Sequence, residues 1–302
     1  MRLLLAAVLA VAGALPVFAQ PGGSPLTADT FRVRRAVPSG DPGLVALVVD
    51  VSMLAESQGP AGQFGDVRIL ETGGVQVPYL VERRDEPLVV DLNLQPFKPA
   101  SRDLQSESGR NRSVYVLRLP YERLPSMRLE LETTARVFQR AIRIGVERKP
   151  DRHRRDPWFE ELASTTWEHA NENVPARPLN LKLPPPQGTE LLVVVDERDN
   201  AALPISAARV LLPSYRLRFY HTGRPLQLLY GRDDLPAPQY DLALLEQQVM
   251  SAEAREITAT PRDDLEAAKT VKTIPESYFW AGLGIAVVIL LALIARLVIR
   301  AS

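Results

Sequence analysis

The stretch Arg216-Leu217-Arg218-Phe219-Tyr220 alternates polar and apolar residues. An antiparallel strand with one face on the core and the other in water has this period of two. The 302-residue chain also contains 26 prolines, many of them inside short apolar runs, which disfavours long helices. Residues 20 to about 275 are therefore predicted to be all-β.

Similar runs rich in Val, Leu and Ile recur along the chain, separated by turn-forming Gly, Pro, Asn and Asp. We predict strands at residues 31–37, 44–51, 67–70, 77–81, 88–94, 114–119, 127–131, 137–146, 179–183, 191–196, 208–212, 215–220 and 226–230. Many short antiparallel strands are typical of sandwiches. The expected fold is mainly β, with two tandem antiparallel β-sandwich domains at residues 20–150 and 151–240.

The pattern changes after residue 240. Leu242, Leu245, Val249 and Ala252 recur at helical spacing, with polar residues between them. This predicts a short helix with these four residues on one face. The motif at 260–263 resembles a helix start with proline at the first position, which predicts a further turn or two at 263–268. Residues 241–277 are thus expected to form a short helix and a polar stalk.

The first nineteen residues have the pattern of a secretory signal peptide. One positive charge at Arg2 precedes an apolar run at 3–17, and Val17 and Ala19 supply small residues before a cleavage point. The apolar core is shorter than the roughly 20 residues that a spanning helix needs. We expect cleavage after Ala19.

A second apolar segment, residues 278–299, predicts a transmembrane helix, because its run of apolar residues matches a hydrocarbon thickness of about 30 Å. Tyr278 and Trp280 stand where aromatic residues gather at a membrane interface, and Arg296 and Arg300 lie at the other end, where positive charge prefers the cytoplasm. The chain is therefore expected to be a single-pass membrane protein with its amino terminus outside and residues 300–302 as a cytoplasmic tail.

The composition excludes several classes of function. The chain has 36 basic and 36 acidic residues, so no overall field attracts nucleic acid. It has no cysteine, which excludes disulfide frameworks, thiolate metal sites and cysteine nucleophiles, and three histidines disfavour a multi-histidine metal centre. We expect no cofactor and no bound metal.

Four motifs occur in a characteristic order: Asp-Val-Arg-Ile-Leu at 66–70, Val-Pro-Tyr-Leu at 77–80, Leu-Leu-Tyr-Gly at 228–231 and Ala-Pro-Gln-Tyr-Asp-Leu at 237–242. Together with the leader and the terminal apolar segment, they resemble the bacterial membrane-anchored family catalogued as domain of unknown function 3999. The resemblance implies a periplasm-facing protein of the inner membrane, sandwiches similar to galactose-binding jelly rolls, and a polytopic membrane protein as partner. It implies no activity and no catalytic residues.

Positive side chains gather in a predicted hairpin loop, followed by an aromatic residue: Arg148, Lys149, Arg152, Arg154, Arg155 and Trp158. A guanidinium group offers a planar fork to carboxylate or phosphate, and the neighbouring indole is suited to stacking. The segment is therefore a candidate anion-binding loop for acidic glycans or lipid headgroups, with a solvated loop as the alternative.

Two further groups of residues are candidate sites of chemistry. Asp196, Asp199 and Asn200 place oxygen ligands close together, but three are too few for calcium, so a polar hairpin turn is the alternative. Glutamates and histidines are also present, at Glu160, Glu161, Glu168, His169 and His221. If this region is extended, the adjacent Glu160 and Glu161 face opposite sides and cannot form a glycosidase pair, and the histidines are expected at strand ends. No enzyme is expected.

Two functions remain open on this sequence. The first is a binding or scaffold component of the envelope, which needs an exposed apolar patch. The second is a carbohydrate-binding module on a membrane stalk, which needs exposed aromatic residues, here Trp158, Trp167 or Tyr115. A glycan-active hydrolase is a third alternative.

Overall fold

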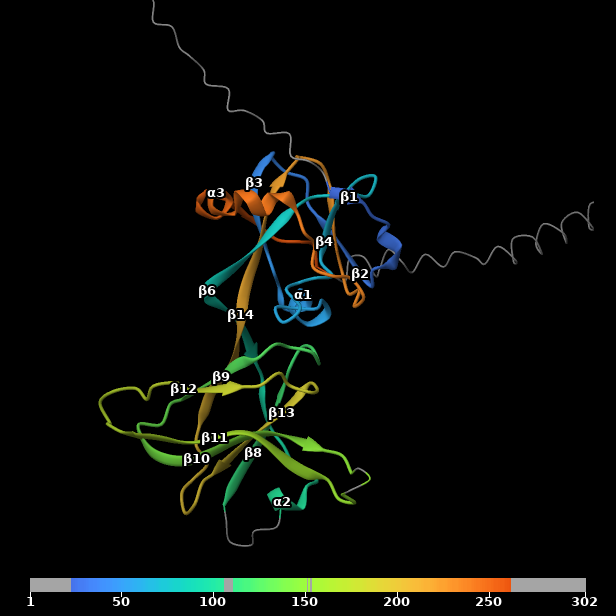
Figure 1. Cartoon of the computed structure of the whole chain (residues 1–302). Helices are drawn as coiled ribbons and strands as arrows, with labels where there is room; N and C mark the ends of the chain where they lie inside the picture. Colours follow the sequence, from blue (N-terminus) through green and yellow to red (C-terminus); the bar gives the residue numbers. More distant parts are fainter. Residues whose placement is uncertain (1–22, 106–110, 151, 153, 262–302) are drawn as a thin grey trace, which may run out of the picture. The chain divides into compact units, whose positions relative to one another are not determined.

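The computed structural model describes residues 23–105, 111–150, 152 and 154–261 (Figure 1). The protein is mainly β, with several antiparallel sheets. The predicted signal peptide at 1–19, the second helical stretch at 263–268, the apolar segment at 278–299 and the tail at 300–302 lie outside the described residues.

Three sheets account for the strands of the described part. The first has the order β1-β5-β4-β15-β2. Its strands are β1 (Gly23–Pro25), β5 (Val75–Gln76), β4 (Arg68–Glu71), β15 (Leu226–Tyr230) and β2 (Val33–Val37).

The second sheet is built around the 17-residue strand β14 (Ile205–His221). On one side β14 pairs with β9 (Met127–Thr133) and β3 (Gly43–Val48), which are followed outward by β12 (Leu179–Leu183) and β16 (Arg255–Ile257). On its other side β14 pairs with β6 (Tyr79–Leu92), so the two long strands run together (Figure 1). Strand β16 is parallel to its neighbour β3, whereas the other described strand pairs of this sheet are antiparallel.

The third sheet has the order β11-β10-β13-β8-β7. Its strands are β11 (Trp158–Ala170), β10 (Val137–Arg148), β13 (Glu190–Asp196), β8 (Arg112–Arg118) and β7 (Leu94–Pro96). Because β10 pairs with both β11 and β13, the domain boundary predicted after residue 150 runs through this sheet. The described residues up to Ala259 form one compact unit.

One cluster of buried apolar side chains has members in all three sheets, for example Leu228 in β15, Phe219 in β14 and Ile142 in β10. Successive side chains of a strand point to opposite faces of its sheet, so every second residue of a strand can join this cluster. In β14, Leu217 and Phe219 are fully buried, as their period of two predicted. Among the residues that the structure describes, no helix is long and apolar enough to cross a membrane.

Several predicted strands are parts of longer ones. The runs at 77–81 and 88–94 belong mostly to β6, and those at 208–212 and 215–220 to β14. Proline suggested the breaks. However, Pro87 and Pro213 both lie at the irregularity of the β6–β14 ladder, between the pairs Leu212–Leu88 and Ser214–Arg84. A proline at such a bulge does not interrupt the strand, because no ladder hydrogen bond is required there.

The helical elements are short: η1 (Ala28–Thr30), α1 (Val51–Glu56), α2 (Arg102–Gln105), η2 (Asp241–Leu245) and α3 (Glu246–Ser251). The last two confirm the predicted helical segment after residue 240. Helix α1 was not predicted, and the strand expected up to Val51 ends before it. The side chain of Asp50 caps α1 by accepting a hydrogen bond from the Met53 amide at 2.9 Å, which starts a helix at this point.

Candidate functional site

The predicted basic loop joins β10 to β11 as the tip of a long hairpin. Arg148 does not contribute to a free basic surface. Its Nε atom forms an ion pair with Glu160 across the hairpin, and its other nitrogens lie 3.4 Å from acceptors of Gln187. The side chain is thus a structural link at the base of the tip.

The remaining basic residues of the tip, Lys149, Arg152, Arg154 and Arg155, are exposed. The guanidinium carbon of Arg154 lies 5.0 Å from the centre of the Trp158 ring, within the range of a cation–π contact. The structure therefore places Arg154 over one face of the Trp158 ring, where the sequence suggested a stacked ligand.

The other aromatic candidates pack into the protein. Trp167 is 5% exposed, lies edge-on to Phe138 with ring centres 5.2 Å apart, and donates from Nε1 to the Arg177 carbonyl at 3.2 Å. Tyr115 is half-buried against the main apolar cluster. The Trp167 ring is therefore covered, and the Tyr115 ring is covered in part.

The oxygen-rich loop after β13 is a connection between two sheets rather than a hairpin, because β13 and β14 belong to different sheets. The carboxylate of Asp196 accepts a hydrogen bond from the Arg198 amide at 3.2 Å. The missed feature here is Glu197, which is fully buried and forms an ion pair with Arg140 at 2.7 Å. Within the described ranges, no group of three or more His, Cys, Asp or Glu side chains is arranged to hold a metal ion.

The glutamates and histidines considered as sites of chemistry lie on strands β11 and β14. Glu160 and Glu161 oppose the consecutive residues Val146 and Gly145 in the extended strand pair, as predicted for side chains on opposite faces. Both histidines lie at strand ends, as predicted. His169 contacts the carbonyl of Val174 at 2.9 Å, and His221 accepts from the Gly223 amide at 2.9 Å through Nδ1.

A surface that the sequence did not reveal is formed by Leu244 and Leu245, which we call the leucine pair. Leu244 is 86% exposed and Leu245 is 42% exposed, whereas Leu242 and Val249 are buried. Leu245 was expected on the buried face. The segment begins as a 3₁₀-helix with about three residues per turn instead of 3.6, which rotates Leu245 away from the core.

The leucine pair is held on a fixed support. The buried guanidinium of Arg218 donates to the carbonyl groups of Val249 and Ala252 at the end of α3 and to the Glu82 carboxylate at 2.8 Å. Burial raises the pKa of Glu82, but hydrogen bonds from Arg216 and Arg218 outweigh it and hold that pKa below its ordinary value. The ionised carboxylate therefore stabilises the guanidinium that caps the helical segment.

The other end of this segment is anchored by an aromatic contact. Tyr240 precedes η2 and packs edge-on against Tyr79 with ring centres 5.5 Å apart. Its hydroxyl donates to the side-chain oxygen of Gln76 at 3.0 Å. Burial raises the pKa of Tyr240 to about 12, so the hydroxyl keeps its proton for this hydrogen bond.

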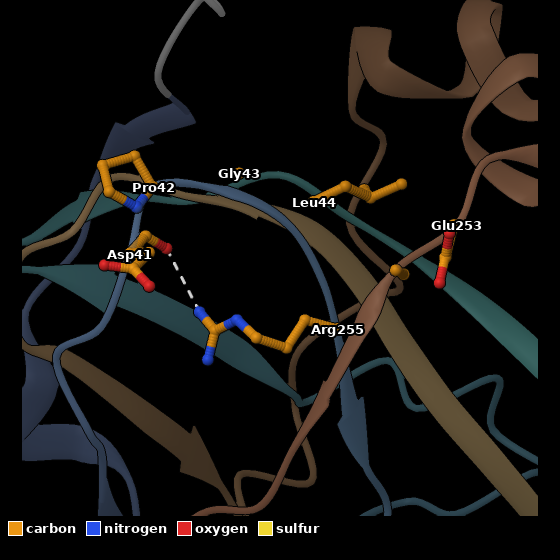
Figure 2. Close-up of a pocket in the computed structure, with 7 residues that line it drawn as sticks. Asp41, Pro42, Gly43, Leu44, Glu253 and Arg255 are labelled. Atoms are coloured by element: carbon orange, nitrogen blue, oxygen red, sulfur yellow. Dashed lines mark hydrogen bonds between the residues drawn. The ribbon is translucent and has the colours of Figure 1, made fainter.

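A shallow cavity of about 460 Å³ lies next to the end of α3 (Figure 2). It is lined by residues 41–44 at the start of β3 and by residues 253–255. The guanidinium of Arg255 donates to the backbone carbonyl of Asp41 at 3.1 Å across the cavity. Leu44 lies in its wall, and the opposing Tyr220 of β14 is 38% exposed. Part of the cavity wall, residues 253–255, thus closely follows the helical segment that carries the leucine pair.

No protein-family model matches this chain, and no curated protein matches it either. The function is therefore argued from the geometry of its residues.

Proposed function

We propose that this chain is a single-pass protein of the bacterial inner membrane whose periplasm-facing β-sandwich part binds another envelope protein and serves as a scaffold component. The leucine pair carries the proposal. The family resemblance, the predicted signal peptide and the predicted span at 278–299 support the location, and the resemblance also favours jelly-roll-like sandwiches and a polytopic membrane protein as partner.

The energetic argument rests on exposure combined with rigidity. Burying a leucine side chain contributes about 1.5–3 kcal/mol, so covering Leu244 and the exposed part of Leu245 favours association by a few kcal/mol. Because Arg218 and Tyr240 already hold the segment, little conformational entropy is lost when a partner binds. Contiguous exposed apolar surface is typical of protein interaction sites, and the two leucines are adjacent.

The test uses the full chain in native membranes solubilised with mild detergent. A Leu244→Glu/Leu245→Glu variant is compared with Val137→Glu, since Val137 is also exposed, at 59%, but lies on β10. We expect a specific partner to co-purify with the parent and with Val137→Glu, and to be lost from the double variant. Equal recovery of that partner with all three chains would refute the proposal.

The glycan-binding alternative is weakened by the packing of Trp167 and Tyr115 and by the position of Arg154 over Trp158. Calorimetric titration with periplasmic glycans measures it directly. Saturable binding that Trp158→Ala abolishes would favour a carbohydrate module over a scaffold. Hydrolysis of such a glycan during the titration would favour the hydrolase alternative.

The exposed basic residues of the β10–β11 tip support a second, weaker activity, binding of anionic polymers or lipid headgroups. Charges of this kind act together within a Debye length of about 8 Å at physiological salt, so the binding should be weak and salt-dependent. Replacing Arg152, Arg154 and Arg155 with serine should abolish binding to anionic vesicles while changing stability by less than about 0.5 kcal/mol per site. If the parent chain does not bind anionic vesicles at low salt, the anion-binding activity is refuted and the tip is a solvated loop.

A further inference from the structure

Two long strands end their sheets within the described residues. Strand β6 has 14 residues and pairs only with β14, and strand β11 has 13 residues and pairs only with β10. The outer edge of such a strand presents backbone N–H and C=O groups that can pair with another strand. Proteins usually protect these edges with charges, prolines or bulges.

Strand β6 has all three kinds of protection. Residues 82–86 are five consecutive charged residues, Pro87 follows them, and the ladder with β14 is irregular at this point. An added strand would meet charged side chains in the centre of the edge and a missing amide donor beside them.

Strand β11 lacks this protection over residues 163–167, Ala-Ser-Thr-Thr-Trp. The segment has no charge and no proline, and threonine and tryptophan favour strands. Its ladder with β10 is regular from Ala163 onward, because the bulge lies before that residue. The chain that follows β11 contacts the side chain of His169, which is beyond the segment, and the indole of Trp167 at its carboxyl end.

We propose that a second copy of this chain pairs with this edge, antiparallel and about a two-fold axis at Thr165. A two-fold axis perpendicular to a sheet keeps each side chain on its own face, so opposed residues must be separated by an even number of positions. Placing the axis at Thr165, the middle residue, pairs all five residues of the segment.

This register is self-complementary. Thr165 lies opposite Thr165 of the second copy, Ser164 opposite Thr166, and Ala163 opposite Trp167, whose side chain stays buried in its own chain. Hydroxyl pairs of this kind stabilise neighbouring strands, and no like charges meet. Ser164 and Thr166 are exposed in the single chain, so their face is open to a second copy. The interface does not involve the leucine pair and is independent of the proposed partner.

The sharpest test is a cysteine cross-link, because the natural chain has no cysteine. Directly opposed residues of an antiparallel pair have Cα atoms about 4.5–5.5 Å apart, inside the range of about 4.4–6.8 Å that a disulfide spans. The full-length Thr165→Cys variant in native membranes should become mainly a disulfide-linked dimer on mild oxidation. Arg83→Cys, on the protected edge of β6, is the matched control and should remain monomeric. Equal cross-linking of the two variants would overturn the proposal.

Charge exchange tests the register. Adding Ser164→Lys and Thr166→Lys to the Thr165→Cys chain places lysine opposite lysine at two positions and should lower dimer formation about tenfold. Adding Ser164→Glu and Thr166→Glu should do the same. Co-expression of the two variants with tags of different size should restore cross-linking as heterodimers, which a purely structural defect would not allow. Unchanged cross-linking in the lysine variant, or no heterodimer in the mixture, would contradict the register.

Discussion

Replacing Glu197 with alanine removes one half of a buried ion pair in the loop that connects β13 to β14. The Glu197 side chain is fully buried, and that of Arg140 is 8% exposed. The Arg140 Nε atom donates to the carboxylate at 2.7 Å, and the Leu203 amide donates to the same carboxylate at 3.1–3.2 Å. Alanine therefore leaves the Leu203 amide without its acceptor and the Arg140 guanidinium without its counter-ion, while that guanidinium keeps its hydrogen bonds to the carbonyl groups of Gln139 and Ala201.

Loss of one partner of a buried ion pair typically costs about 3–5 kcal/mol, because the remaining charge stays buried without compensation. This estimate already includes the cost of leaving the Leu203 amide without an acceptor. With a urea m-value of about 2–3 kcal/mol/M, the unfolding midpoint should fall by about 1–2.5 M. Replacing both partners, Arg140→Met with Glu197→Leu, should recover most of that loss, since neither charge is then buried.

The measurement is urea unfolding followed by far-ultraviolet circular dichroism, on a soluble chain from Gln20 to Thr273 that we expect to fold as a β-rich protein. Glu160→Ala is the matched control. Its ion pair with Arg148 is more exposed, so its loss should cost less than about 1 kcal/mol. If Glu197→Ala costs no more than Glu160→Ala, the assignment of Glu197 as the anchor of this connection is wrong.

Three further outcomes are expected. The pKa of Glu82 is lowered in the folded chain, so its carboxylate stabilises the fold above the ordinary pKa of 4.5, and this stabilisation is lost as the pH falls through the lowered pKa. In urea titrations at different pH, Glu82→Gln should therefore reduce the loss of stability on acidification. In the same assay Gly145→Val should destabilise the chain by at least the roughly 1–3 kcal/mol that overpacking usually costs, because even a Cβ atom there would lie 2.2 Å from the carbonyl oxygen of Glu160. An unfolding midpoint equal to that of the parent would contradict this packing. A reporter active only outside the cytoplasm should work after Pro261 and fail after Ser302, and the opposite pattern would exclude the proposed orientation.

Much of the secondary structure follows from local pattern. The bounds of β12 and β15 are those predicted from the sequence, because each is a compact run of alternating or apolar residues between turn signals. Strand β11 was missed. Its glutamates, serine and threonines alternate with few large apolar residues, so an edge strand of this kind has a weak hydrophobic period.

The candidate sites were likewise predictable only where they depend on residues close together in the sequence. The sequence identified the basic tip, since charges close together along a chain remain close in a hairpin. It did not show that Arg148 is paired with Glu160, that Trp167 is buried, or that Leu245 is exposed. Each of these depends on a partner from another part of the fold or on the local helix type.

Composition, proline content and the alternation of polar and apolar residues by themselves determined that this protein is mainly β, because the amphipathic pattern of a strand depends only on consecutive residues. Only the tertiary structure decided that β14 joins β3, β6 and β9 in one sheet, that β10 links β11 to β13 across the expected boundary, and that residues 163–167 lie on a strand at the end of a sheet. Strand pairing over long sequence distances depends on which apolar faces can be buried together, and that choice is made by the whole chain at once.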